Sequence, residues 1–539
     1  MQVTPFMLGR IAQRPSDIRT HAGLLWHVST LLTDMKRDLD PEHGSGVTSA
    51  SPYETAWVAL VRDRDAPDRL AFPEVLTSLL RAQERDGSWG EPYPWSVLPT
   101  MAALLALVRA GPARGAKRAA RRACHYLERA LPRWASEPAD TPQIELLMLN
   151  VLDELAEAGV MLTLPGEAQL RARRAEALER LPLDDLYAGN STLIHALEAL
   201  GQQIDYDRVS SLRAGGCYGY SPAATAAVLS RARTWDTEAA AWVRQMADRH
   251  SGAMPASFPL DVFECAWVLH YLWLGHCAPR PHEHEPTRTT LLWLRESLSD
   301  DGARFSRVAG LPRDVDDTAM TIAVLNRYGA HTAPASLKHF TRDGRYVSFV
   351  TESSPSPSVN AHALEALLSV DSLTMPGDGG PHDSVVSYLL DAQENHGGWV
   401  DKWHISPYYA THSVVSALAQ VRGQHIGERL ARAMRWLVST PHHDGGWGMR
   451  GSSLEETAYA LLSLHALHRR LDNRDVVSSQ RYRDLMQRGR QWLLAHFTQL
   501  TLSARLPRMW VDKDLYAPTR VIYAAVLAAL HVTWLAVEA

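Results

Sequence analysis

Three copies of one short turn motif constrain the fold of this 539-residue chain more than any other feature. The copies read QERDGSWG at 83–90, QENHGGWV at 393–400 and PHHDGGWG at 441–448. Each offers a helix end, a glycine turn and a tryptophan that can cover the next helix, which is the pattern expected when helix pairs stack around a ring. Because copies occur in both halves of the chain, we predict two related helical barrels, each able to enclose a cavity.

The rest of the chain has mainly helical periodicity. Segments such as PTMAALLALVRAG and ETAYALLSLHALHRRL are rich in Ala and Leu with helical apolar spacing, and several such segments end at glycine. Few segments alternate with period two. The exception is RYVSFV, which follows the turn RDG and predicts a short hairpin. The predicted fold class is therefore all-α.

Two turn-rich or Pro-rich stretches, at 40–52 and 277–287, mark the expected boundaries. They divide the chain into an N-terminal helix within 1–45, a middle block at 46–279 and a C-terminal block at 280–539. The chain is too long for one ordinary core, so an assembly of this kind agrees with its length.

Composition excludes several classes of protein. The formal net charge of -5 is small for this length and argues against a nucleic-acid partner or a polybasic membrane surface. The four cysteines lie far apart without a CxxC pair, so neither a disulfide framework nor a zinc site is indicated. No secretory signal and no run of about 18 apolar residues is found, which predicts a cytoplasmic protein without stable membrane insertion.

The stretch PRDVDDTAMT, at 312–321, is the main chemical signal. Acidic residues suit the positive end of a helix, and Gly329 would end this one, so a helix N-terminus accounts for two adjacent acids. A third acid, Asp314, is harder to explain in this way, because three close carboxylates repel one another unless one holds a proton. In an apolar pocket Asp316 would then stay protonated near neutral pH and act on a weakly basic carbon–carbon double bond.

DVDDTAM, together with SPYETAWVALV at 51–61, resembles the class II diterpene cyclases, whose marks are DxDDTA and a SxYDTAWVA segment. Further matches in the family's order are STLIHALEAL, YSPAATAAVL, FPLDVFECAWVL and DKWHISPYYAT. The resemblance extends from residue 51 to about residue 460. It implies that the N-terminal helix and residues 280–539 form one α/α barrel, that residues 46–279 form a second, inserted barrel, and that the active cavity lies between the two. It also implies that protonation of a polyprenyl diphosphate starts cyclisation, with geranylgeranyl diphosphate as the usual substrate and a copalyl-type product.

The resemblance also implies roles for single residues. Asp316 matches the proton donor, and Asp314 and Asp317 match the flanking acids that position and reload it. Asn360 falls where the family places an asparagine that holds the donor, although it could equally start a helix. Glu145 matches a glutamate implicated in binding Mg²⁺ with the diphosphate; a helix first-turn acid is the alternative reading.

The sequence departs from the family pattern at the diphosphate. Ala177 stands where some members have a diphosphate-binding lysine, so Arg180, or else Arg174 or Arg173, is expected to make that contact. Glu54 in SPYETAW replaces the usual Asp and, with Ser51, would form a helix capping box.

A second departure concerns the last step of the reaction. His195 matches a histidine that, in plant ent-copalyl enzymes, joins an asparagine in holding the water that removes the final proton. Ala256 stands at the asparagine position. A different stereoisomer, a hydroxylated product or a rearranged clerodane or halimadane skeleton therefore remains open, and so does a purely structural role for His195.

Aromatic faces stabilise carbocations by about 0.5 to 2 kcal/mol. The expected substrate-facing candidates in the C-terminal block are Trp399, Trp403, Tyr408, Trp447 and Tyr459. Trp403 and Tyr408 are favoured, because tryptophans in the turn repeats usually pack between helices.

The chain has no DDxxD motif with the downstream trio of a class I synthase, and the residues after the last repeat are too few for an additional helical domain. The product is therefore expected to keep its diphosphate and pass to a separate class I terpene synthase. A cyclase acting on farnesyl diphosphate to give a drimane product, a squalene- or hopene-type cyclase, and a non-catalytic α-barrel binding protein are the alternatives. Oligomeric state, including a homodimer, stays open.

Overall fold

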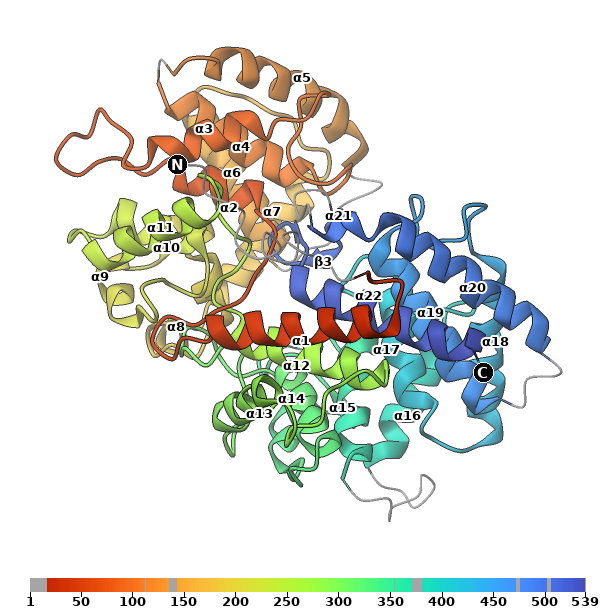
Figure 1. Cartoon of the computed structure of the whole chain (residues 1–539). Coiled ribbons are helices and arrows are strands. Elements are labelled where there is room, and N and C mark those ends of the chain that lie inside the picture. The colour runs from red at the N-terminus through yellow and green to blue at the C-terminus, as the bar shows by residue number, and fades with distance from the viewer. Residues whose placement is uncertain are drawn as a thin grey trace.

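The computed structural model describes residues 17–111, 113–134, 143–352, 354–370, 381–471, 476–501 and 506–538. These residues form two helical units, as Figure 1 shows. Each unit has its own core of buried apolar side chains. Strand structure among them is limited to short antiparallel hairpins and isolated bridges. The predicted all-α class with two barrels is confirmed.

The first unit is a ring closed by contacts among α2, α4, α6, η2 and α10, with the other helices outside it. Its elements are α2 (Pro52–Val58), α3 (Pro73–Arg81), α4 (Val97–Arg109), α5 (Ala116–Trp134), α6 (Ile144–Glu157), α7 (Glu167–Glu179), α8 (Leu183–Tyr187), η2 (Thr192–Gln203), α9 (Tyr206–Val209), η3 (Ser210–Leu212), α10 (Pro222–Arg231) and α11 (Thr237–Arg249).

The second unit is a larger ring, closed by contacts among α12, α14, α15, α17, α19 and α22. Its helices are α1 (His21–Asp38), α12 (Asp261–Leu274), α13 (Glu285–Ser297), α14 (Val315–Arg327), η4 (Ala335–Phe340), α15 (Pro357–Leu368), α16 (Pro381–Asp391), α17 (Pro407–Leu418), α18 (Gln424–Ser439), α19 (Leu454–Arg470), α20 (Ser479–His496), α21 (Thr498–Thr501) and α22 (Thr519–Glu538). One hairpin joins β1 (Thr341–Arg342) to β2 (Arg345–Tyr346), and a second joins β3 (Trp510–Val511) to β4 (Leu515–Tyr516).

The boundary between the units lies earlier than the expected position at 279/280. Helix α12 is a member of the second ring, and its apolar side chains belong to the second core. The Pro-rich stretch at 277–287 therefore lies inside the second unit and leads into α13. Helix α1 also belongs there, since it packs on α13 and α22, and Figure 1 shows it alongside α22. Residues 1–16 of the predicted N-terminal segment lie outside the described residues.

The tryptophans of the three turn copies are held in the same way. The indole Nε1 of Trp89, Trp399 and Trp447 donates to the carbonyl oxygen of the leucine ten residues earlier, at 2.7, 2.7 and 2.9 Å. Each tryptophan backbone N–H also donates to a threonine hydroxyl of the following helix. All three side chains are fully buried, so these tryptophans join helix pairs within a core.

The first glycine of each turn is required by its backbone. Gly87, Gly397 and Gly445 have φ values of +101°, +106° and +96°, a region that L side chains rarely adopt. A Cβ at these positions would lie 2.4, 2.8 and 3.1 Å from the carbonyl oxygen of an arginine on the next outer helix. The glycine of each turn repeat is therefore required for the helices to pack this closely.

Replacing Trp447 with alanine should destabilise the second unit by about 3 to 5 kcal/mol, because the substitution leaves a large cavity and removes a buried hydrogen bond. The measurement is the midpoint of thermal unfolding followed by circular dichroism. Met449→Ala, on the same turn but 42% exposed, is the matched control and should leave the midpoint almost unchanged. Equal midpoints for the two variants would contradict the packing role.

Helix α22 is apolar and long enough to cross a membrane by composition alone. An 18-residue window, Thr519–Ala536, has a mean hydropathy of 1.5, yet 83% of it is buried within the fold. It is a wall of the second ring.

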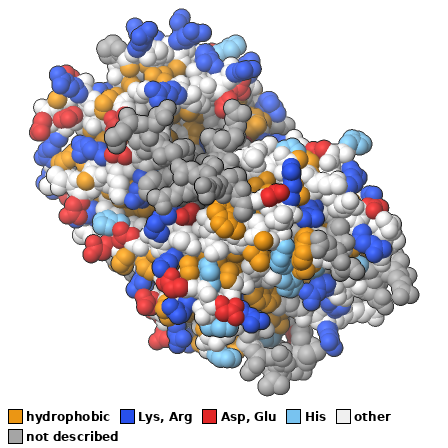
Figure 2. Space-filling model, in the orientation of Figure 1, with side chains coloured by type: hydrophobic (Ala, Val, Ile, Leu, Met, Phe, Trp, Pro, Cys, Tyr) orange, Lys and Arg blue, Asp and Glu red, His pale blue; other side chains and the backbone are white. Residues whose placement is uncertain are grey.

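On the face shown in Figure 2, Lys and Arg side chains mingle with Asp and Glu side chains, so neither sign of charge dominates that face.

Candidate active site

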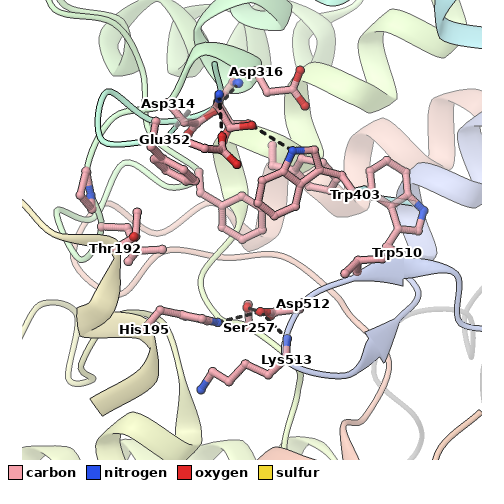
Figure 3. A pocket seen from close by; sticks show the side chains of 18 of the residues that line it. Thr192, His195, Ser257, Asp314, Asp316, Glu352, Trp403, Trp510, Asp512 and Lys513 are labelled. Carbon is pink, nitrogen blue, oxygen red and sulfur yellow. Dashed lines mark hydrogen bonds and ion pairs between the residues drawn. The ribbon is translucent and has the colours of Figure 1, made fainter. Parts of the chain in front are cut away.

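A cavity of about 460 Å³ lies where the two units meet, which is within the range of small-molecule sites. Its lining draws on η2 of the first unit, the start of α14, and the β3–β4 hairpin. Aromatic side chains form much of the wall. Figure 3 shows Asp314 and Asp316 on one side and His195, Ser257 and Asp512 on the opposite side. The cavity thus has two polar ends separated by an apolar wall.

The three aspartates of the DVDD stretch occupy the first turn of α14, as predicted. Asp314 is the N-cap, and its carboxylate accepts the backbone N–H of Asp317 at 2.8 Å. Asp314 and Asp317 are buried, whereas the Asp316 side chain is 23% exposed. All three line the cavity, but Asp316 is the one with the greatest access to its contents. The helix ends at Arg327, and Gly329 follows with a positive φ.

His362, on α15, holds Asp316. Its Nδ1 lies 2.6 Å from Oδ1 of Asp316, and the imidazole is almost fully buried. Asn360, the residue expected to make this contact, instead accepts from Tyr346 N–H and donates to the carbonyl oxygens of Tyr346 and Ser356. Asn360 therefore joins the β1–β2 hairpin to α15. The two residues lie on different faces of this helix, since each step of one residue turns it by about 100°.

The electrostatics of this cluster favour retained protons. Burial raises the pKa of Asp314 from its ordinary value of 3.8 to about 7. Burial and the charge of Asp314 raise the pKa of Asp317 well above its ordinary value. For His362, burial favours the neutral ring, but the Asp316 carboxylate outweighs it and raises the pKa above 6.5. The cluster can thus store a proton near neutral pH beside an apolar cavity.

The rate of any protonation by Asp316 should fall as the pH rises through about 7, where Asp314 loses its proton. An ionised Asp314 places a second negative charge beside the carboxylate that Asp316 becomes, which opposes proton donation. The measurement is kcat/KM between about pH 6 and about pH 9, with thermal unfolding recorded at each pH to exclude loss of fold. A rate that stays constant across this range would contradict the expected coupling.

The opposite end of the cavity is built around Asp512, between β3 and β4. Its Oδ1 lies 2.9 Å from Nε2 of His195, and its Oδ2 accepts the hydroxyl of Ser257 at 2.8 Å. Nδ1 of His195 lies 2.6 Å from the carbonyl oxygen of Gly219. Sequence reasoning singled out His195, which does line the cavity, but not its partner, which lies 317 residues further along the chain.

Lys513 fixes the hairpin to the first unit. Its buried ammonium lies 2.8 Å from carboxylate oxygens of Glu54 and Glu198 and 2.6 Å from the hydroxyl of Ser221. The ammonium donates hydrogen bonds to Glu198 and Ser221, while its contact with Glu54 is an ion pair. Glu54 thus has a structural role, although only half of the predicted capping box forms: Ser51 accepts the Glu54 N–H, while the Glu54 carboxylate turns to Ser221 and Lys513.

Of the predicted aromatic residues, one lines the cavity and the others pack elsewhere. Trp403 lines the cavity, with its Nε1 donating to the Ser348 hydroxyl at 2.9 Å. Trp399, Tyr408 and Tyr459 are not in the cavity lining. They are used in packing: Trp399 joins two helices, Tyr408 stacks on Trp436 at 4.8 Å, and Tyr459 donates to Glu455 at 3.0 Å.

Other aromatic residues of the lining were missed. They come from α12, from loops before and after α14, and from the β3–β4 hairpin: Phe263, Trp267, Phe305, Phe349, Trp510 and Tyr516. The expected boundary at 279/280 puts α12 in the other unit, and the hairpin carries no turn repeat. The available signal was the run WVDKDLY, which puts three charges between apolar pairs and would have indicated buried charges.

The expected diphosphate and metal ligands do not form a complete site among the described residues. Arg180 is largely exposed and paired with Glu176, and it does not line the cavity. Glu145 lies in the first turn of α6, close in sequence to the lining residue Gln143. In the part of the chain that the structure describes, no group of three His, Cys, Asp or Glu side chains could hold a metal ion. A single carboxylate still suits Mg²⁺, which proteins often bind through one or two carboxylates and substrate phosphates.

Comparisons with known proteins agree with this geometry. Residues 349–499 match the model of the squalene-hopene cyclase C-terminal domain. The chain is 32% identical to an ent-copalyl diphosphate synthase from Streptomyces sp. strain KO-3988 over 92% of this chain and 94% of the relative. It is 32% identical to a copalyl diphosphate synthase from Streptomyces anulatus over 90% and 89%. The solved ent-copalyl diphosphate synthase from Streptomyces platensis superposes with a TM-score of 0.79 at 31% identity, covering 95% of this chain and 99% of that one.

Proposed function

The chain belongs to the copalyl diphosphate synthase family of class II diterpene cyclases, and on that premise we propose that it converts geranylgeranyl diphosphate into a bicyclic diterpenyl diphosphate. The observation that carries this proposal is the cluster of carboxyl groups at the start of α14. Asp316 faces an aromatic-walled cavity between the units, while Asp314 and Asp317 stay buried behind it.

Asp316 starts the reaction. Its carboxyl proton passes to the terminal double bond of the polyprenyl chain, and the electron pair of that bond forms the new C–H bond. His362 donates to the carboxylate left on Asp316, which stabilises the product of proton transfer and lowers the barrier. The adjacent carbocation is then attacked by the next double bond along the chain, and ring closure follows.

The aromatic wall protects the cations. Trp403, Trp510 and Trp267 line the cavity, and a cation over an aromatic face gains about 0.5 to 2 kcal/mol. The same side chains exclude water, which would otherwise capture the intermediates. The reaction ends with proton loss, so substrate and product are isomers.

Mg²⁺ and the partner enzyme belong to the same proposal. Glu145 would hold Mg²⁺ together with phosphate oxygens of the substrate, where the ion would neutralise the charge of the diphosphate. Because the diphosphate is retained, the product suits a separate class I terpene synthase that ionises this group. A cytoplasmic location would place the enzyme beside a water-soluble diphosphate substrate.

The experiment incubates the purified protein with geranylgeranyl diphosphate or farnesyl diphosphate in separate tubes, each with Mg²⁺ or with EDTA. Extracts are dephosphorylated and analysed by gas chromatography and mass spectrometry. A bicyclic C20 alcohol whose yield is lower with EDTA than with Mg²⁺ supports the proposal. A bicyclic C15 alcohol would instead indicate a drimane-type cyclase, and release of inorganic diphosphate would contradict class II chemistry.

A further inference from the structure

The cyclisation needs a second group besides the acid, namely a base that removes the last proton. The inference about this base rests on the proposed function. A cyclisation started by one added proton must lose one proton to give an alkene of unchanged composition. Among the described residues that line the cavity, the ionisable groups away from the DVDD cluster are His195, Glu352, Asp512, Lys513 and Tyr516. Each can be considered as a base.

Three of these groups are poor candidates for reasons of charge or position. Burial would lower the pKa of Lys513, but the carboxylates of Glu198 and Glu54 raise it above its ordinary value, so Lys513 stays an ammonium without a lone pair. Burial raises the pKa of Tyr516 well above its ordinary value, so it stays a neutral phenol. Glu352 lies beside Asp314, on the side of the cavity where the substrate is protonated (Figure 3), and is paired there with Lys402 and the backbone N–H of Ser348. These groups leave His195 and Asp512.

The hydrogen bonds of His195 show that its ring has no free lone pair. Its Nδ1 faces the carbonyl oxygen of Gly219, which only accepts, so Nδ1 carries a proton. Its Nε2 faces Oδ1 of Asp512, so a proton lies between them as well. Burial disfavours the charged ring, but Asp512 outweighs it and raises the pKa of His195 above 6.5. The imidazole is therefore a donor on both sides and not the acceptor of a third proton.

Asp512 has the opposite character. Burial alone would favour its neutral form, but the charges of His195 and Lys513 hold its pKa at about 2, so it is a carboxylate at neutral pH. Among the described residues, Oδ1 receives His195 Nε2 and the backbone N–H of Lys513, and Oδ2 receives the hydroxyl of Ser257 alone. A carboxylate has about four lone-pair positions, so one remains on Oδ2. The side chain is 18% exposed and lines the cavity.

We propose that the Asp512 carboxylate is the terminal proton acceptor, with His195 and Ser257 as positioning residues that aim its free lone pair into the cavity. Oδ2 removes a proton from a carbon next to the final cationic centre, and the electrons of that C–H bond become the new double bond. Asp512 becomes a neutral carboxylic acid and returns its proton to solvent. Because a C–H bond next to a carbocation is a very strong acid, the placement of the base matters more than its strength.

The test compares Asp512→Asn with Asp514→Asn, the same change two residues on in the same hairpin. Asp514 accepts the backbone N–H of Tyr53 and does not line the cavity. Wild-type and variant proteins are incubated with geranylgeranyl diphosphate, and the dephosphorylated products are resolved by chromatography and mass spectrometry. The readout is the ratio of products, which does not depend on how much of each variant is folded.

In Asp512→Asn we expect substrate consumption to continue, because Asp316 is intact. The share of the wild-type product should fall at least about tenfold in favour of alcohols or double-bond isomers, since a positioned base contributes about 10²-fold or more. Asp514→Asn should keep the wild-type ratio. Ser257→Ala, which removes only the donor to Oδ2, should shift the ratio in the same direction by a smaller amount.

An unchanged ratio in folded Asp512→Asn overturns the inference, and so does a complete loss of substrate consumption in that variant while Asp514→Asn remains active. If Asp512→Asn does not fold, Ser257→Ala decides: a shifted ratio supports the inference and an unchanged ratio overturns it. Wild-type protein that forms no bicyclic product overturns the proposed function, and this inference with it.

Discussion

Replacing Asp316 with asparagine should lower the rate of cyclisation by about 10³-fold or more, because the reaction has no other way to begin than proton donation to a double bond. Asparagine has the same shape but no acidic proton. The fold should survive, since the side chain is partly exposed to the cavity and an amide can still form a hydrogen bond with His362. The measurements are substrate consumption by mass spectrometry and the midpoint of thermal unfolding.

Asp301→Asn serves as the control for this change, because Asp301 lies on an exposed turn before α14 and its side chain is 72% exposed. It should cyclise the substrate at the wild-type rate. Substantial turnover by a folded Asp316→Asn variant would remove Asp316 from the role of acid.

His362 should be the next most sensitive position. Replacing it with leucine removes the donor to Asp316 at similar side-chain volume. We expect a loss of about 10- to 100-fold in kcat, since hydrogen bonds to charged groups contribute about 1.5 to 3 kcal/mol. His362→Asn keeps an amide N–H where Nδ1 lies and should retain more activity than His362→Leu. The measurement is kcat and KM for each variant.

If His362 had a purely structural role, the expected result would differ from this loss of kcat. Both variants would then lose stability together, and kcat for the folded fraction would match the wild type. A difference between Leu and Asn in kcat, with KM little changed, is the result that a positioning role requires.

The sequence predicted the barrels because their marks are local. A glycine with positive φ and a tryptophan two residues later leave a short, readable motif at Gly397 and Trp399, and the structure uses both residues as packing predicts. The acidic N-terminus of α14 was equally local. Its three carboxylates lie within four positions, and Asp316 lines the cavity as expected.

The contacts that the sequence did not reveal join residues far apart in the chain. His362 meets Asp316 across 46 positions, and Asp512 meets His195 across 317. Neither pair leaves a spacing pattern, because each depends on how two packed elements face each other. Family resemblance pointed to Asn360, two residues before His362 on α15, and the direction of each side chain decides which of them reaches Asp316.

The aromatic wall was predicted only in part for the same reason. Tyr408 and Tyr409 are neighbours in sequence, but one residue of an α-helix turns the side-chain direction by about 100°, so the two rings point different ways. Tyr408 stacks on Trp436, while Tyr409 meets the lining residue Trp510 at 4.7 Å. Composition identifies aromatic-rich segments; the phase of the helix decides which ring faces the cavity.

The most direct test of the central claim is to run the reaction with geranylgeranyl diphosphate in deuterated water and determine the mass of the dephosphorylated product. A carboxyl proton exchanges with solvent, so donation by Asp316 predicts a bicyclic alcohol carrying one deuterium at the carbon that was protonated. The same incubation with Asp316→Asn should give unchanged substrate. A bicyclic product without deuterium, or a product formed with release of inorganic diphosphate, would contradict the account.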